Sequence, residues 1–86
     1  MSNGPLTFEE LASVINSCAG VPVSGEELAG DPLRSFADLN VDSLGLLGIV
    51  AELERRYGIP LGTEAEQCAS PHELLNFVNA QITSGV

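Results

Sequence analysis

One helical pattern between two clear end signals constrains this chain more than any other feature. Asp42 is a preferred N-cap residue, because its carboxylate can accept from the free N–H groups of a first helical turn. Gly58, with Pro60 close behind, is a typical helix end. Between them an apolar stripe recurs at spacings of 4, 3 and 4, formed by Leu46, Val50, Leu53 and Tyr57. The pattern predicts a helix of about four turns with one face against a core.

The first and last helices are predicted by the same rules. Thr7 and Glu10 have the spacing of a capping box, and Gly20 ends the pattern. The last helix is expected to begin with Ser70 as the N-cap, Pro71 as the first helical residue and Glu73 as the third. The inward residues expected are Phe8, Leu11, Val14, Ile15 and Cys18 in the first helix, and Leu74, Leu75, Phe77, Val78 and Ile82 in the last.

Two segments connect these helices. Residues 20–41 form a long loop in which Ser24 can cap a single turn, and the apolar anchors expected are Val21, Val23, Leu28, Leu33, Phe36 and Leu39. Its length fits first and second helices that run roughly antiparallel. Residues 61–69 predict a short third helix, capped by Thr63 with Glu66 three residues later. Four helical patterns without a strand pattern predict an all-α four-helix bundle, with three longer helices, a short third helix and a long first loop.

Length and charge narrow the possible functions. The 86 residues make one domain, 1–86, with flexible ends expected at 1–6 and 84–86. Twelve acidic residues against three arginines give a net charge of −9, which argues against nucleic acid or an anionic membrane as a partner. The expected partners present basic surfaces. No apolar run is long enough to span a membrane and no secretory signal is evident, so a cytoplasmic location is expected. The chain is also expected to be a monomer.

The cysteines and the single histidine give no metal pattern. Cys18 and Cys68 are fifty positions apart, and two free thiols are expected in a reducing compartment. Cys18 is interpreted as a small buried apolar residue, whereas the environment of Cys68 stays open. His72 is expected to be a surface residue and not a metal ligand.

Ser43, the first residue after the predicted cap, has three possible roles. As a nucleophile it would need a base and an orienting group, but its surroundings are not a G-x-S-x-G elbow and His72 begins another helix. The chain is therefore not expected to be an enzyme. The other roles are a helix-start residue in a non-catalytic acidic interaction module, and an attachment point where a phosphodiester would meet the positive end of the helix dipole.

The surroundings of Ser43 leave two further questions open. Leu44, Leu47 and Ala51 form a second apolar line on the same helix, which is either a docking surface or ordinary core. Asp31, Asp38 and Asp42 bring acidic charge to the end of the long loop. This acidic charge is either a solvated loop or a landing site for an electropositive partner.

The residues around Ser43 resemble a known family. The residues that carry this resemblance are Asp42-Ser43-Leu44, Leu46-Leu47, the run from Leu53 to Gly58, and Ala69-Ser70-Pro71 before the last helix. In these residues the chain is similar to the acyl carrier proteins of dissociated aromatic polyketide synthases. The resemblance covers about residues 11–82. It implies 4′-phosphopantetheine, derived from coenzyme A, on Ser43, with malonyl and growing polyketide chains carried as thioesters. Fatty acid and peptide-synthetase carriers are the alternatives within this class.

The resemblance also implies roles for partners and for other residues. The partners implied are a phosphopantetheinyl transferase, a ketosynthase–chain-length-factor pair, a malonyl acyltransferase and a ketoreductase. The expected partner contacts are Asp42, Leu44, Leu47, Ala51, Glu64 and Glu66, although Glu64 and Glu66 could equally form a merely solvated face. The residues expected to line an acyl chain are Leu46, Val50 and Leu53. Gly48 departs from the family pattern, which usually has an acidic residue there. Gly45 is a second glycine inside the helix, and each costs about 0.5–1 kcal/mol relative to alanine.

Overall fold

The computed structural model describes residues 5–84, and this part of the chain is all helical, without a strand. Its helices are α1 (Phe8–Ala19), α2 (Gly25–Gly30), α3 (Ser43–Tyr57), α4 (Gly62–Glu66) and α5 (Pro71–Ser84). The three longer helices that were predicted are α1, α3 and α5, and the predicted short helix is α4. The turn predicted after Ser24 is the six-residue helix α2, closed by a capping box between Ser24 and Glu27.

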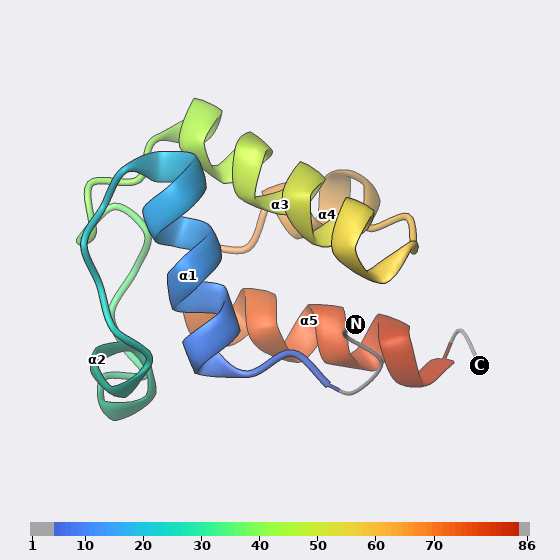
Figure 1. Ribbon diagram of the computed structural model, residues 1–86, viewed down its shortest axis with the longest axis horizontal. Coiled ribbons are helices and arrows are strands. Elements are labelled where there is room, and N and C mark those ends of the chain that lie inside the picture. The colour runs from blue at the N-terminus through green and yellow to red at the C-terminus, as the bar shows by residue number, and fades with distance from the viewer. Residues whose placement is uncertain (1–4, 85–86) are drawn as a thin grey trace.

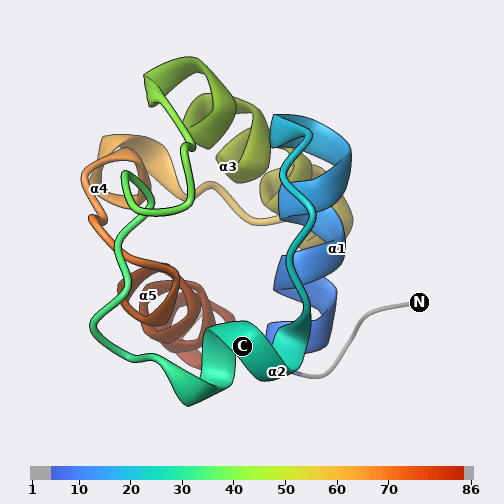
Figure 2. The same cartoon turned by 90° about the vertical axis from the view of Figure 1, so that its left-hand side faces the viewer.

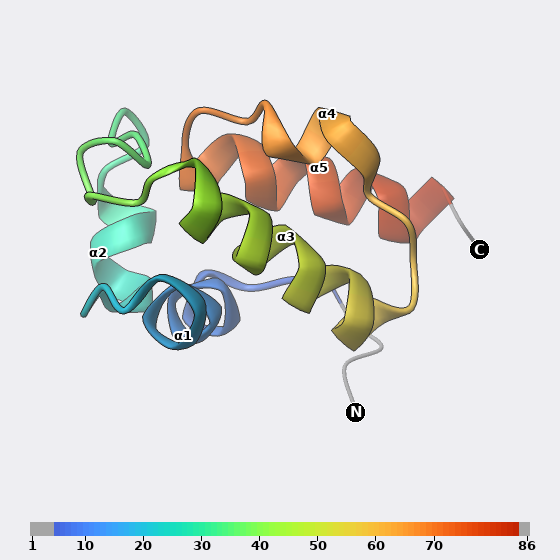
Figure 3. The same cartoon turned by 90° about the horizontal axis from the view of Figure 1, so that it is seen from above.

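The helices surround a single core. Figure 1 shows α3 and α5 running in the same general direction, with α1 steeply inclined to both. The predicted roughly antiparallel sense of α1 and α3 is confirmed, because Glu10 near the start of α1 contacts Arg56 and Tyr57 at the end of α3, and Ala19 at the end of α1 lies next to Gly45 at the start of α3. Figures 2 and 3 show α3 between α1 and α4. None of the helices in residues 5–84 combines the length and the apolar character needed to cross a membrane.

The predicted helix ends are confirmed for the long helices. Gly20 and Gly58 end α1 and α3 in the left-handed conformation, with φ of 71° and 66°. Thr7 accepts a hydrogen bond from the Glu10 N–H as predicted. The Glu10 carboxylate, which was expected to reach back to Thr7, contacts α3 instead. At α5, the Ser70 hydroxyl accepts from the Glu73 N–H.

Half of the helix residues that the apolar patterns predict to face inward are buried in the core, and the other half are partly buried against it. Its fully buried members include Leu11 and Ile15 of α1, Ile49 and Leu53 of α3, and Leu74 of α5. Leu6 is also buried, although a flexible lead was expected over residues 1–6. Its N–H donates to Asn79 Oδ1 at 2.6 Å and its carbonyl accepts from Asn79 Nδ2 at 3.1 Å. Residues 1–4, 85 and 86 lie outside the described part, and α5 continues to Ser84.

The long loop is anchored across the molecule. Leu28, Phe36 and Leu39 are buried as predicted, whereas Leu33 is 90% exposed, so its predicted role as an anchor is wrong. The Phe36 N–H donates to the Ala69 carbonyl at 2.8 Å, which ties the loop to the segment before α5. This connection delivers the chain to Asp42 at the start of α3.

The end of α1 lies close to the first turns of α3, and two glycines of α3 face this contact. A Cβ at Gly45 would lie 3.3 Å from Ala19 Cβ and equally close to atoms of Val41 and Asp42. A Cβ at Gly48 would lie 3.7 Å from Cys18 Cβ, an ordinary contact distance. A side chain at Gly45 would thus be crowded by its neighbours, whereas Gly48 has room for a methyl group.

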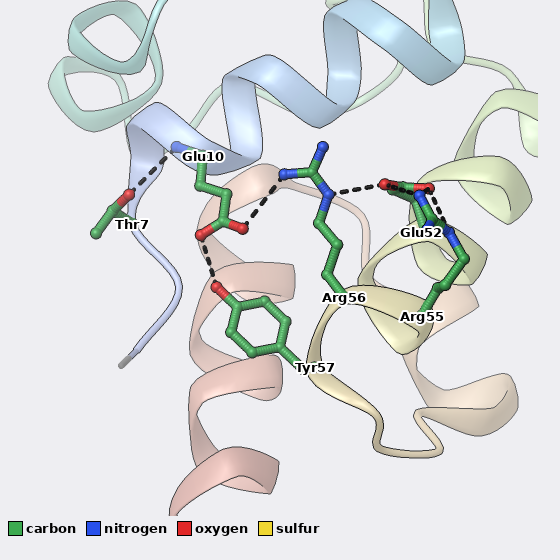
Figure 4. A network of polar contacts seen from close by, with 6 residues as sticks. All are labelled: Thr7, Glu10, Glu52, Arg55, Arg56 and Tyr57. Atoms are coloured by element: carbon green, nitrogen blue, oxygen red, sulfur yellow. Dashed lines mark hydrogen bonds and ion pairs between the residues drawn. The ribbon is translucent and has the colours of Figure 1, made fainter. Parts of the chain in front are cut away.

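A polar network joins α1 to the other end of α3 (Figure 4). The Tyr57 hydroxyl donates to Glu10 Oε1 at 2.7 Å, and Arg56 Nη1 lies 3.3 Å from Glu10 Oε2. Arg55 and Arg56 both donate to the Glu52 carboxylate at 2.7 Å. Their hydrogen bonds lower the pKa of Glu52 below the ordinary value of 4.5, Arg55 having the larger effect.

The two glycines provide a matched test of this packing. Gly48→Ala should raise the free energy of unfolding by about 0.5–1 kcal/mol, because alanine favours a helix and the added methyl has room. Gly45→Ala should stabilise the protein less or not at all, because the added methyl group would be crowded by atoms of Ala19, Val41 and Asp42. Urea unfolding of both variants measures the difference, and equal stabilisation by the two substitutions would contradict the crowding at Gly45.

The polar network predicts a loss of stability in acid. Because the pKa of Glu52 is lower in the folded chain, its contribution is present at neutral pH and is lost as the pH falls below about 4.5 and through the folded pKa. Glu52→Gln should therefore lower the melting temperature at pH 7, and the gap to the unmodified sequence should close in acid. Thermal unfolding across pH measures this, with Glu9→Gln on the exposed face of α1 as the control. A gap that is independent of pH would contradict it.

Candidate functional site: the start of helix α3

Ser43 is exposed and is the first residue of α3. The preceding Asp42 has an extended backbone, and its Oδ1 accepts a hydrogen bond from the Gly45 N–H at 2.8 Å. The Asp42 carbonyl accepts from the Leu46 N–H at 2.9 Å. The predicted cap is confirmed, and it holds Ser43 at a rigid helix start.

Ser43 lies on the rim of a cleft of about 380 Å³ between α3 and α4. The cleft is lined by Ser43, Leu46, Leu47, Thr63, Glu66 and Gln67. Of the three residues expected to line an acyl chain, Leu46 lies here. Val50 and Leu53 are 3% and 0% exposed and belong to the hydrophobic core, so their contact with a chain stays a prediction.

The start of α4 is capped from α3, not by Thr63. Helix α4 begins at Gly62, and the Glu54 carboxylate accepts from the Leu61 N–H at 2.7 Å and from the Gly62 N–H at 3.3 Å. The predicted cap at Thr63 is wrong because α4 begins two residues earlier than that cap implies, with Leu61 in the cap position, and Thr63 lines the cleft instead. Glu54 therefore joins α4 to α3 and positions the far wall of the cleft.

An exposed apolar line runs along α3 beside Ser43. Leu44 is 77% and Leu47 43% exposed, and Ala51 is exposed too. This answers the question that the sequence left open, since these side chains lie outside the core. Asp42 is exposed, and so are Glu64 and Glu66 of α4. All six residues that were expected to contact partners are therefore accessible. Their use by a partner stays a prediction.

The charge around the site is negative and largely uncompensated. Within residues 5–84 each arginine is paired with a carboxylate: Arg34 with Asp31, Arg55 with Glu52, and Arg56 with Glu52 and Glu10. Asp38 exchanges hydrogen bonds with Ser35 in a loop turn. The aspartates of the loop thus shape the backbone, and they also add to the acidic surface.

Neither the cysteines nor the histidine is among the residues that line the cleft. Cys18 and Cys68 are both half-buried free thiols, and burial raises the pKa of each, so both stay protonated at neutral pH. His72 is half-buried, so its expected surface position is wrong. Its ring centroid lies 4.6 Å from that of Phe8, and its Nε2 is 3.0 Å from the Leu28 carbonyl oxygen. Among residues 5–84, no group of three or more histidine, cysteine or acidic side chains is placed to hold a metal ion.

The residues at the site fit a covalently attached arm. The hydroxyl of Ser43 is accessible, an anionic group there would meet the positive end of the α3 dipole, and the adjacent cleft has two leucines in its wall. Asp42 already occupies the Gly45 N–H, so fewer free N–H groups remain than the sequence suggested. A small helical domain with an accessible serine over a partly apolar cleft is the arrangement of a carrier domain.

Comparison with known proteins agrees with this class. Residues 9–78 match the family described as "Phosphopantetheine attachment site". The chain is 45% identical over 80 residues to the curamycin polyketide synthase acyl carrier protein of Streptomyces cyaneus, covering 93% of this chain and 91% of that protein. It is 43% identical over 81 residues to a probable acyl carrier protein of Streptomyces halstedii, covering 94% and 88% of the two chains.

Solved structures lead to the same family. The solution structure of the acetyl actinorhodin acyl carrier protein from Streptomyces coelicolor superposes with a TM-score of 0.81 at 28% identity, covering 99% of this chain and 100% of that one. The oxytetracycline acyl carrier protein gives a TM-score of 0.77 at 34% identity, covering 96% and 88%. The chain belongs to the acyl carrier proteins and is close to those of polyketide synthases. It is a carrier of phosphopantetheine-bound groups, not a catalyst, and it works with synthase enzymes.

Sequence reasoning missed three residues of the site: Glu54, Thr63 as a cleft residue, and Gln67. The segment containing Thr63 and Gln67 was recognised as a short helix, but nothing in its pattern shows which face meets α3. Glu54 is seven residues from Leu61, outside the spacing of a local cap. These roles depend on how α4 folds back on α3.

The two functions of the Asp42 side chain, as a cap and as a charge, can be separated. Asp42→Ala should lower the free energy of unfolding by about 1 kcal/mol, because the Gly45 N–H loses its acceptor. Asp42→Asn should cost less, because the amide oxygen still accepts. Chemical denaturation of both variants measures this, and an Asp42→Ala variant as stable as the unmodified protein would contradict the role of the cap.

Proposed function

We propose that Ser43 is the residue that bears 4′-phosphopantetheine. The observation that carries the proposal is its position, exposed at the first residue of α3 and on the rim of the α3–α4 cleft. It also lies inside the region that matches the attachment-site family. The arm, when attached, supplies a terminal thiol that holds acyl groups as thioesters.

The chain's own residues then have distinct tasks. Asp42 fixes the backbone at the attachment point, and Leu46 and Leu47 offer apolar surface next to it. Neither cysteine is needed to carry the acyl group, since burial raises the pKa of both thiols and keeps them in the less nucleophilic form. The protein transports and shelters the acyl group, and other enzymes perform the reactions.

The cargo that we propose is malonyl and growing poly-β-keto chains. Three similar proteins are the acyl carrier proteins of the curamycin, oxytetracycline and actinorhodin polyketide synthases. This supports the polyketide assignment over a fatty acid or peptide-synthetase carrier. The family match also leaves the non-catalytic interaction module without support.

The partners that we propose are a phosphopantetheinyl transferase, a ketosynthase–chain-length-factor pair, a malonyl acyltransferase and a ketoreductase, met in the cytoplasm by a monomeric carrier. Each would contact Leu44, Leu47 and Ala51 on α3, with Asp42, Glu64 and Glu66 around them. Exposed apolar side chains bordered by uncompensated acids suit a partner with a basic rim, and such encounters are fast, brief and sensitive to salt.

The attachment is tested by intact mass. Incubation with coenzyme A and a promiscuous phosphopantetheinyl transferase should add one phosphopantetheine to the protein, and Ser43→Ala should abolish the gain. Ser13→Ala, which removes an exposed serine from α1, is the matched control and should leave the gain unchanged. Modification of the Ser43→Ala variant, or none of the unmodified sequence, would refute the proposal.

A further inference from the structure

We propose that Glu66 sorts the cargo by charge, keeping a malonyl group out of the α3–α4 cleft while an uncharged β-keto chain enters it. The inference rests on the proposed attachment at Ser43 and deepens it. Glu66 would thereby decide which acyl groups the carrier presents to solvent and which it shelters.

The two walls of the cleft differ in chemistry. The α3 wall has Leu46 and Leu47 beside Ser43, whereas the other wall is polar, with Thr63, Glu66 and Gln67. A ketone oxygen only accepts hydrogen bonds, so the hydroxyl of Thr63 and the amide of Gln67 are suitable donors for it. The Glu66 carboxylate has no donor to offer, and it does not repel a neutral chain.

A malonyl group ends in a carboxylate, and nothing near the cleft compensates a second negative charge. The arginines of the described residues are all bound to carboxylates outside the cleft lining. The nearby Asp42 and Glu64 have the same sign as Glu66. His72 belongs to another region, with its ring against Phe8 and the Leu28 carbonyl. A malonyl carboxylate in the cleft would therefore lose water and gain only repulsion.

This sorting suits the chemistry of chain extension. A malonyl group held outside is available to the acyl-transfer and condensing partners that must reach it. A neutral poly-β-ketone, whose carbonyls react with water and with one another, is sheltered beside Leu46 and Leu47. The same short arm can thus present one cargo and shelter the other without a change of fold.

The experiment compares two cargoes of nearly equal shape. Malonyl and acetoacetyl groups differ in the terminal group, a carboxylate in one and a methyl ketone in the other. Each is loaded on the holo-protein, loading is verified by intact mass, and the backbone amide NMR shifts of Leu47, Thr63 and Gln67 are measured against the unloaded holo-protein. Acetoacetyl should shift these amides, and malonyl should leave them near their unloaded positions.

Two neighbouring glutamates on α4 provide matched variants. Glu66→Gln should let malonyl shift the cleft amides as acetoacetyl does, raising the ratio of sheltered to exposed malonyl about tenfold. Glu66→Lys should raise the ratio further. Glu64→Gln removes an equal charge from outside the cleft lining, and it should behave as the unmodified sequence does.

Three results would overturn the sorting: equal shifts from both cargoes in the unmodified sequence, no shift from either, or a malonyl form that Glu66→Gln leaves unchanged. They differ from a failure of the attachment itself. If Ser43 takes no arm, the mass spectrum shows it before any shift is measured, and both proposals fail together.

Discussion

Close contact between the end of α1 and the start of α3 is the constraint on which the site depends. At Gly45, Ala19 and Val41 approach α3 to a distance at which an added methyl group would be crowded. In the same turn, Asp42 caps the helix through the Gly45 N–H. Gly45 therefore has two roles. It lies at the close contact between α1 and α3, and its N–H donates to the capping carboxylate of Asp42. Together they hold Ser43 rigidly at the surface, where an attached arm can reach both solvent and the cleft.

The remainder of the fold supports this arrangement from a distance. The network of Glu10, Glu52, Arg56 and Tyr57 joins α1 to the last turns of α3, so α3 is held near both ends. Glu54 on α3 caps α4 and keeps the second wall of the cleft beside the first. Pairing the arginines within the fold leaves the other carboxylates without counter-charges. The same packing that positions the serine thus leaves the excess acidic charge of the sequence at the surface.

Local patterns predicted the elements well, because capping and helical periodicity act over a few residues. Asp42, Gly20, Gly58 and Ser70 mark helix ends as expected. The predictions that were wrong concern contacts between distant segments. Leu33 is apolar and correctly spaced, yet the loop leaves it in solvent, and Leu6 is held by Asn79, seventy-three positions away. His72 was expected at the surface, because nothing near it in the sequence reveals that Phe8 covers its ring.

By itself the sequence determined where the long helices begin and end, which stripe of each is buried, the excess of negative charge and the serine at the start of α3. These follow from interactions within one or two turns and from composition. Only the tertiary structure decided that Gly45 is crowded while Gly48 is not, that Leu44 and Leu47 face solvent, and that Glu66 shares a cleft with Ser43. Those outcomes depend on the distances between helices, which are set by how side chains from separate segments pack together.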